Sequence, residues 1–241
     1  MTAVRAGQPV HLGRRRERCL LSLLLLRTGV AVPVDRLIDL LWDGNPTQNA
    51  RACLHTHVSR LRTRLGDEVP LIARDGGYVA DVDPGTVDAH VFVSQVDLAT
   101  TVEDAGRRAE TLRNALNLWH GPALADVASD RLRDRIASGL TELRQRAREL
   151  LVDTEIVRGN HERVLADLFA LTAEYPLHER PTGQLMLALY RAGRQPDALR
   201  QYHRLRTRLA EELGVDPGPE LQQRYAAILR HDPRLSAVRS A

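Results

Sequence analysis

The chain has 241 residues, a length that predicts two domains, and 43% of the residues are apolar. No apolar run approaches the roughly 18 residues that cross a bilayer, and the N-terminus has no export signal, so we expect a cytoplasmic protein. All 34 basic residues are arginine, which excludes a Walker A phosphate loop, a Schiff base and a Ser-Lys catalytic pair. Residues 1–66 carry 11 arginines and 4 acidic residues, whereas residues 67–241 carry 23 arginines and 27 acidic residues. This excess of positive charge indicates that the first third binds a polyanion, and a salt-bridged surface is the alternative.

Two short amphipathic helices are expected first. Residues 14–27 open with the basic run RRRER and then place leucines at the spacing of one helical face. Pro33 introduces a second apolar pattern over Val34–Trp42, and Gly44 follows it as a breaker. Both segments are therefore predicted to be helices that bury one face and expose the other.

A third helix has the clearest signals at its ends. Asn45 is a favourable N-cap, Pro46 suits the first helical position, and the pattern then runs without a breaker to Leu65. Gly66 supplies the stop signal that commonly follows a helix. The sequence therefore predicts a long helix over residues 45–65.

A hairpin and a domain boundary follow the third helix. Residues 71–74 and 78–82 are strand-like, and Asp75-Gly76-Gly77 between them is a turn signal. Asp83-Pro84-Gly85 then separates this unit from the rest of the chain. We therefore predict a first domain, residues 1–85, in which a helix-turn-helix carries a wing-like hairpin.

The remainder of the chain, residues 87–235, is predicted to be an all-α domain. Gly159 with Leu165 and Gly193 with Leu199 are offset by 34 residues, which is the period of tetratricopeptide helix pairs. The sequence therefore predicts a tetratricopeptide-like module whose concave helical surface binds protein. The fold class is mainly α, a winged helix-turn-helix followed by this module.

On a helical wheel the third helix separates a core face from a reading face. Its core face, within about 60°, consists of Leu54, Val58, Leu61 and Leu65. Small side chains occupy the opposite face, and they are Ala52, Thr56, Ser59 and Thr63. Longer polar side chains flank that face, namely Asn49, Arg51, His55, Arg60 and Arg62. Such a helix can enter a major groove and place its flanking arginines near bases and phosphates.

The reading face gives each candidate residue a role. Arg60 is expected to donate two hydrogen bonds to a guanine, and Thr56 to offer its methyl group to a thymine. Arg74, just before the hairpin turn, is expected to enter the minor groove, with Tyr78 packed beneath the hairpin. The other arginines are expected to contact phosphate, and a solvated surface group is the alternative for each. The predicted DNA-binding set is Arg14, Arg15, Asn49, Arg51, Thr56, Ser59, Arg60, Arg62, Arg64 and Arg74.

Six motifs together resemble one family. They are VDRLIDLLW (34–42), HVSRLRTRLG (57–66), RDGGY (74–78), LWHGPAL (118–124), GQLMLALYRAGRQPDAL (183–199) and ELGVDPGPEL (212–221). Across residues 10–232 the chain resembles the Streptomyces antibiotic regulatory proteins, in which an OmpR-type winged helix precedes a bacterial transcriptional activator domain. By matching of these motifs, Thr56 and Arg60 fall on base-reading positions, Arg62 on a backbone-contacting position and Arg74 on the wing position.

The resemblance also implies a function. Members of this family are activators of secondary-metabolite clusters that bind direct repeats near the −35 region of promoter DNA and recruit RNA polymerase. They bind DNA as homodimers or side-by-side protomers. Because the expected partner is promoter DNA, a nucleoid-associated protein is expected. The family begins with an extra strand, whereas about ten residues precede the basic helix start here, so a shortened N-terminal sheet is expected.

Other classes of protein remain as alternatives. His55 and His57 are two residues apart and are expected to point in different directions, and no metal-ligand spacing occurs, so we expect no catalysis, metal or cofactor. Cys19 and Cys53 are expected to be small buried or semi-buried fillers rather than a disulfide. A repressor with the same fold, or a helical adaptor or sensor that binds protein or a small effector, stays open.

Overall fold

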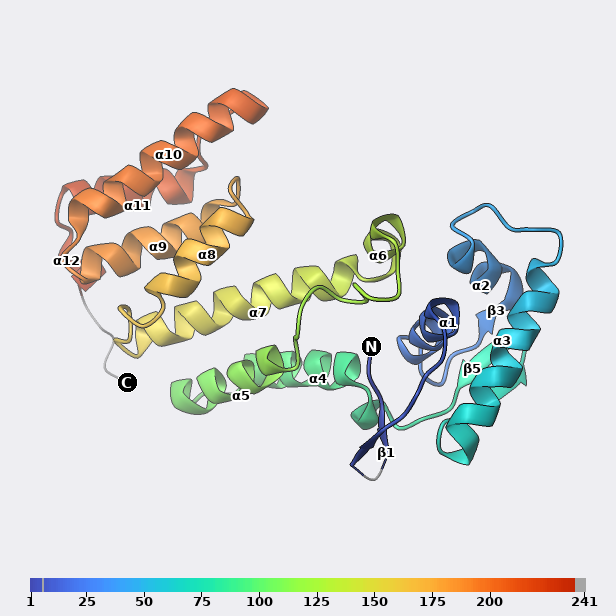
Figure 1. Cartoon of the computed structure of the whole chain (residues 1–241). Coiled ribbons are helices and arrows are strands. Elements are labelled where there is room, and N and C mark those ends of the chain that lie inside the picture. The colour runs from blue at the N-terminus through green and yellow to red at the C-terminus, as the bar shows by residue number, and fades with distance from the viewer. Residues whose placement is uncertain (6, 237–241) are drawn as a thin grey trace. The chain divides into compact units, whose positions relative to one another are not determined.

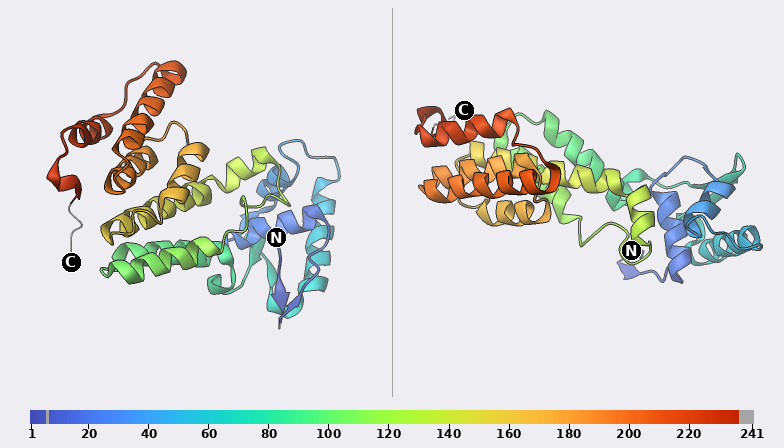
Figure 2. Two further views of the ribbon diagram at one scale, coloured as in Figure 1. Left: turned by 60° about the vertical axis from the view of Figure 1, so that its left-hand side comes forward. Right: turned by 90° about the horizontal axis from the view of Figure 1, so that it is seen from above.

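Helices make up most of the chain, and the described strands all lie before residue 81. The computed structural model describes residues 1–5 and 7–236. It divides into two units, one of residues 1–95 with 115–144 and the other of residues 96–114 with the chain from residue 145 onward. Ribbon views show the helices of each unit (Figure 1, Figure 2). The predicted class, a mainly helical chain that begins with a winged helix, is confirmed.

Residues 1–85 of the first unit form three α-helices with a small sheet beside them. The helices are α1 (Arg15–Leu25), α2 (Val34–Leu41) and α3 (Ala50–Leu65). The antiparallel sheet has the order β3 (Val32–Pro33), β5 (Gly77–Ala80) and β4 (Leu71–Arg74). A separate antiparallel pair precedes α1 and consists of β1 (Val4–Arg5) and β2 (Gln8–Pro9). Two 3-10 turns follow α3 and β5, at Gly66–Glu68 and Pro84–Thr86.

The third helix begins later than predicted. It starts at Ala50, so the predicted start at Asn45-Pro46 is wrong, and Asn49 stands at the N-cap position. Asp43 and Gly44 adopt positive φ angles of 51° and 83° after α2. The five residues before Ala50 are all exposed and carry no large apolar side chain, so a helical turn there would bury nothing. Ala50 is 3% exposed and is the first α3 residue to reach the core.

The wing-like hairpin is confirmed. Arg74 pairs with Gly77, which leaves Asp75 and Gly76 as a two-residue turn. Both turn residues have positive φ angles, 50° and 70°, the backbone that a type I′ turn requires and that aspartate and glycine tolerate. The second strand ends at Ala80, two residues earlier than predicted.

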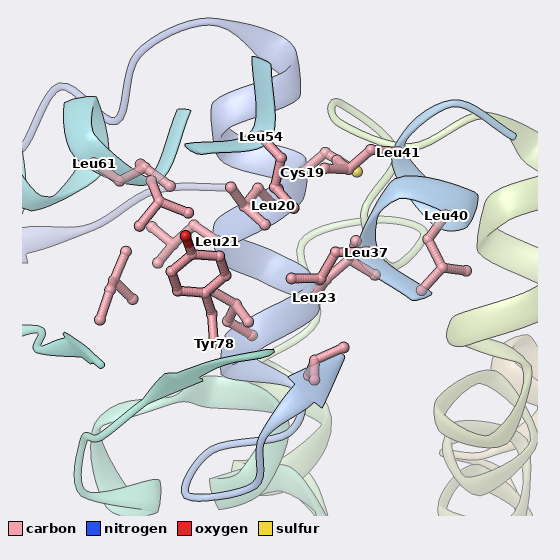
Figure 3. Close-up of a cluster of buried hydrophobic side chains, with 14 of the residues drawn as sticks. Cys19, Leu20, Leu21, Leu23, Leu37, Leu40, Leu41, Leu54, Leu61 and Tyr78 are labelled. Carbon is pink, nitrogen blue, oxygen red and sulfur yellow. The ribbon is translucent and has the colours of Figure 1, made fainter. Parts of the chain in front are cut away.

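All three helices and the sheet contribute to the first core. Leu20 and Leu21 of α1, Leu54 and Leu61 of α3, and Tyr78 of β5 lie together in this cluster (Figure 3). Each of these four leucines is at most 2% exposed. Burial of a leucine side chain contributes about 1.5–3 kcal/mol, so this cluster fixes the orientation of α3.

A segment far along the sequence completes the same core. Val127 and Leu132 are 3% and 4% exposed and belong to the cluster formed by the three helices. Leu132 lies in α6 (Asp130–Ile136), whose first turn is capped because Ser129 Oγ accepts a hydrogen bond from the Leu132 backbone N–H. The first core therefore draws on residues from both sides of the Asp83-Pro84-Gly85 segment.

The remaining helices confirm the all-α prediction. They are α4 (Asp88–Thr101), α5 (Ala105–Asn117), α7 (Ser138–Val157), α8 (Leu165–Glu174), α9 (Glu179–Arg191), α10 (Gln195–Leu213), α11 (Pro219–Leu229) and α12 (Pro233–Ser236). In the second unit α9 packs against α8, α10 and α11. Gly159 and Gly193 lie two residues after the ends of α7 and α9 and adopt φ angles of 81° and 74°. The two glycines, 34 residues apart, thus occupy equivalent turns, one between α7 and α8 and the other between α9 and α10, as a tetratricopeptide-like repeat predicts.

Candidate nucleic-acid interface

The core stripe of α3 is buried as the wheel predicted. Leu54, Val58, Leu61 and Leu65 are 0%, 1%, 0% and 3% exposed. They recur every three or four residues and face α1 and α2, against which α3 packs. The burial of this stripe determines which face of the helix points away from the unit.

The opposite face of α3 is a row of small exposed side chains. This outer row consists of Ala52, Thr56, Ser59 and Thr63. The Thr56 hydroxyl donates to the Ala52 carbonyl at 3.0 Å, and the Thr63 hydroxyl donates to the Ser59 carbonyl at 3.1 Å. Both hydroxyl groups are therefore turned to the helix backbone. The side chains of this row project only a short distance from the helix, and Ala52, Thr56 and Thr63 each offer a methyl group to a ligand.

One side of α3 meets a buried carboxylate from α1. Glu17 is fully buried, and its Oε2 accepts hydrogen bonds from Arg64 Nη1 at 2.7 Å and from the Arg14 backbone N–H at 2.8 Å. Its Oε1 lies 3.4 Å from Arg60 Nη1 and 3.7 Å from His57 Nδ1. We name the group formed by Glu17, His57, Arg60 and Arg64 the charged shoulder.

The contacts of the charged shoulder also set its protonation. Burial alone raises the pKa of the Glu17 carboxyl, but the hydrogen bonds from Arg14 and Arg64 more than offset this, so the pKa lies below its ordinary value of 4.5. Burial lowers the pKa of His57, Glu17 opposes this, and the Arg60 charge lowers it further. At neutral pH one carboxylate therefore faces two guanidinium groups and a neutral imidazole, with one positive charge in excess.

The other side of α3 meets uncharged groups. Arg62 donates from Nε and Nη2 to the Leu71 carbonyl of β4 at 2.8 Å and 2.5 Å, and its guanidinium lies 5.9 Å from the centre of the Tyr78 ring. The Tyr78 hydroxyl and His55 Nδ1 share a hydrogen bond of 2.6 Å. We name the group formed by His55, Arg62, Leu71 and Tyr78 the neutral shoulder, because Arg62 meets a carbonyl and an aromatic ring there rather than a carboxylate. Tyr78 is 7% exposed, so its predicted packing is confirmed.

The two histidines of α3 reach opposite shoulders, as expected. His55 contacts Tyr78, whereas His57 approaches Glu17. Neither side chain approaches the other, so the pair is no metal site. Over the described ranges 1–5 and 7–236, no three His, Cys, Asp or Glu side chains are grouped in a way that could hold a metal ion.

Three further candidates surround the reading face. Asn49 is exposed at the N-cap of α3 rather than inside the helix. Arg51 pairs with Asp35 of α2 at 2.5 Å, and both side chains are largely exposed. Arg74, at the hairpin turn, is 68% exposed and lies 3.4 Å from Asp75. Exposed pairs of this kind contribute about 0–1 kcal/mol, so a phosphate can replace the carboxylate at little cost.

The arginines at the start of α1 face different surroundings. Arg14 is exposed, and Arg15 donates from Nε to the Val127 carbonyl at 3.2 Å. Arg16, another arginine of this run that was expected near phosphate, lies 5.1 Å from the centre of the Trp42 ring. The structure therefore does not bring Arg15 to α3, while Arg16 contributes to the positive potential that acts on His57.

Glu17 is the residue of this site that the sequence analysis missed. It stands three, four and seven residues before Leu20, Leu21 and Leu24, which is the spacing of one helical face. A carboxylate on an apolar face is unusual and needs a cationic partner. That position, inside an arginine run, was the available signal for the charged shoulder.

The cysteines differ from each other. Cys19 is buried, which raises the pKa of its thiol to about 11. Cys53 is exposed on α3, so its expected burial is wrong. The physical reason is its place on the helix, one residue before Leu54 and therefore about 100° away from the core stripe.

Comparisons with known proteins identify the family. The family described as "Bacterial transcriptional activator domain" matches residues 87–229, and that described as "Transcriptional regulatory protein, C terminal" matches residues 7–80. The regulatory protein DnrI of Streptomyces peucetius is 36% identical over 232 residues, which cover 91% of this chain and 85% of DnrI. The chain belongs to the Streptomyces antibiotic regulatory protein family.

Other relatives extend this result. The regulatory protein AfsR of Streptomyces coelicolor is 39% identical over 244 residues, 99% of this chain and 24% of AfsR. A structure of EmbR from Mycobacterium tuberculosis, in complex with a low-affinity phosphopeptide, has a TM-score of 0.86 and 36% identity and covers 94% of this chain. This chain spans 62% of that EmbR chain and about a quarter of AfsR. The predicted resemblance is confirmed, and these relatives are regulatory proteins.

The family assigns the class of function, DNA-dependent regulation of transcription. Both matched families are parts of transcriptional regulators, one over the winged helix and one over the helical remainder. None of the helices in the described part of the chain is long and apolar enough to cross a membrane. The reading face of α3 lies within the first of the two matches, at residues 50–65.

Proposed function

We propose that this chain is a sequence-specific transcriptional activator of a secondary-metabolite biosynthetic cluster. In this proposal residues 1–85 bind direct repeats near the −35 region, as a homodimer or as side-by-side protomers, and residues 87–235 contact protein, including RNA polymerase. The observation that carries the proposal is the outer row of α3, which is exposed between two anchored shoulders. Family membership supports the regulatory class.

The outer row suits a major groove. Side chains no longer than serine or threonine let the helix backbone approach the base edges. Thr56 offers its methyl group to a thymine because its hydroxyl is bonded to the helix. Arg60, half exposed beside the row, is the candidate for a bidentate contact to a guanine. Asn49 and Ser59 are both exposed, and we propose that they contact neighbouring bases or sugar-phosphate groups.

The flanking arginines are proposed to position the helix. Arg51 and Arg62 lie toward the hairpin and α2, where the wall of a major groove would run, and Arg14 lies exposed at the start of α1. Arg74 carries the wing contact in the minor groove. Arg15 and Arg64 also remain predicted phosphate contacts, although each donates a hydrogen bond inside the unit.

Selection and mutation test the reading of DNA. The wild-type chain is used to select duplexes from a randomised pool, and Arg60→Ala is compared with Arg204→Ala, an exposed arginine on α10 that serves as the charge-matched control. We expect Arg60→Ala to lose about 5–150-fold in preference for the selected duplex over a scrambled one, with weak nonspecific binding retained. Unchanged preference in Arg60→Ala would remove α3 as the reader.

Transcription from purified RNA polymerase separates activation from its alternative. A template carrying the selected repeat upstream of a weak promoter is expected to yield more transcript as the chain is added. A fall in transcript would assign the chain as a repressor with the same fold. If no duplex is enriched over the starting pool, the helical adaptor becomes the better interpretation.

A further inference from the structure

The negative charge of Glu17 is not needed for a surface that binds DNA. The side chain is fully buried, it lies on the core face of α1, and its negative charge opposes binding to a polyanion. A buried carboxylate without partners costs several kcal/mol, so it is kept only where cationic groups and hydrogen bonds compensate it. Its cationic partners are both arginines of α3.

The two arginines are held to different degrees. Arg64 is 32% exposed, and its 2.7 Å contact with Glu17 Oε2 is that of a strong charge-assisted hydrogen bond. Arg60 is 50% exposed, and its 3.4 Å contact with Oε1 lies beyond the usual range of hydrogen bonds. Arg64 therefore neutralises the carboxylate, whereas Arg60 carries the positive charge in excess.

The backbone before α1 is built around the stronger pair. Gly13 has a φ of +90°, and a Cβ atom placed there would lie 2.1 Å from Glu17 Oε2 and 2.3 Å from Arg64 Nη1. The next backbone N–H, that of Arg14, donates to the same Oε2 at 2.8 Å. The Glu17–Arg64 pair thus fills a space that only glycine leaves open.

We propose that Glu17 is a positioning residue for the reading of DNA: it holds Arg64 as a fixed internal partner and holds Arg60 on a weak pair from which Arg60 exchanges to a base. Once Arg60 has moved to the DNA, the Glu17–Arg64 pair remains neutral by itself. Arg64 then acts through Glu17, and this internal role replaces the phosphate contact predicted for Arg64 above. This inference rests on the proposed function of α3 and deepens it.

Glutamine at position 17 tests this role, since it keeps the size of the side chain and removes its charge. In Glu17→Gln Arg64 loses its charged partner and adds one positive charge to that of Arg60, so we expect nonspecific binding to strengthen and its salt dependence to steepen by about 0.9 in the slope of log K against log salt, one phosphate contact. Preference for the selected duplex over the scrambled one should fall about tenfold, because Arg60 is no longer aimed. Asp67→Asn, an exposed site just after α3 with the same change in charge, should change neither quantity by more than about twofold.

A second comparison keeps the inference testable if Glu17→Gln fails to fold, which thermal unfolding would show. Arg64→Met leaves Glu17 with Arg60 as its sole arginine, so the carboxylate retains Arg60 and the preference for the selected duplex over the scrambled one should fall. Weaker binding to both duplexes with an unchanged preference would mean that Arg64 contacts a phosphate and would overturn the inference.

The last arm separates this inference from the proposal beneath it. In an Arg60→Ala background, Glu17→Gln should cause no further loss of preference, because the two residues act through one contact. If Arg60→Ala alone leaves the preference intact, the proposed reading by α3 fails. If Arg60→Ala lowers the preference but Glu17→Gln behaves like Asp67→Asn, only the positioning role of Glu17 fails.

Discussion

On one side of α3 a buried carboxylate meets two arginines, whereas on the other side an arginine and a tyrosine meet neutral partners. The charged shoulder is anchored in α1, and the neutral shoulder is anchored in the hairpin. Charged contacts can be exchanged for phosphate or base, but a guanidinium forked on a backbone carbonyl is fixed by geometry. In the proposed mode of binding, the charged shoulder therefore exchanges a contact with the DNA, and the neutral shoulder fixes the register of the helix.

The shoulders also differ in what supports them from behind. α1 is tied to the segment before α6 by Arg15 to the Val127 carbonyl and by Arg18 to the Asp126 carbonyl, at 3.2 Å and 3.4 Å. The hairpin is held by its own strand pairing and by β3. Residues beyond position 120 therefore help to hold α1, the helix that carries Glu17.

The largest effect is expected from Leu132→Ala, which removes a buried side chain from the core that α1, α2 and α3 share. Leu132 is 4% exposed in the first core, and truncation of a buried leucine costs about 2–5 kcal/mol. We expect reduced protection of α1 amides in hydrogen exchange, although Leu132 lies far outside the winged-helix match at residues 7–80. Hydrogen exchange and thermal unfolding of the whole chain measure this loss.

Leu168→Ala is the matched control for that experiment. Leu168 is fully buried in the core of the second unit, so its truncation should cost a similar free energy there. The protection of α1 amides should then stay at its wild-type level. Equal loss of α1 protection in both variants would contradict a separate first core that includes α6.

A smaller effect is expected from Tyr78→Phe, which weakens the neutral shoulder alone. The variant loses the 2.6 Å hydrogen bond to His55 but keeps the ring beneath Arg62, so we expect a loss of about 0.5–1.5 kcal/mol in the free energy of unfolding. Urea unfolding measures it. Because no arginine changes its charged partner, the salt slope of DNA binding should equal that of wild type, in contrast to Glu17→Gln.

The smallest effect is the acid dependence of the charged shoulder, because burial and hydrogen bonding shift the pKa of Glu17 in opposite directions and partly cancel. The folded pKa lies below the ordinary value of 4.5, so the carboxylate contributes stability that is fully present above pH 4.5 and is lost as the pH falls through the folded pKa. Urea unfolding between pH 7 and pH 3 should show wild type and Glu17→Gln converging at the acid end. Parallel curves over that range would assign the acid dependence to other carboxyl groups.

Periodicity was sufficient to predict the parts of this site that local sequence determines. The stripe from Leu54 to Leu65 and the alternation of turn and strand around Asp75-Gly76 each specify one structure, and both are confirmed. The start of α3 was not determined in this way. Asn45-Pro46 satisfies the usual start signals, but no apolar side chain follows within its first turn, and burial at Ala50 decided where the helix begins.

Contacts between distant segments could not be predicted from local patterns. Nothing near Val127 or Leu132 in the sequence indicates that they belong to a core formed mainly by residues 12–80. Glu17 is an intermediate case, because its place on an apolar face was visible but its partners on α3 were not. The sequence shows where the arginines lie along the chain, but only the fold shows which of them are already paired with a carboxylate.

The outer row of α3 has one more consequence. Thr56 and Thr63 turn their hydroxyl groups to the helix, so at these two positions the row presents methyl groups rather than hydrogen-bond donors. A methyl group in the major groove marks thymine, but cytosine methylated at C5 carries the same group at the same place. In the proposed mode of binding, base modification would therefore be visible to α3, and a methylated C·G pair would replace a T·A pair at the position proposed for Thr56.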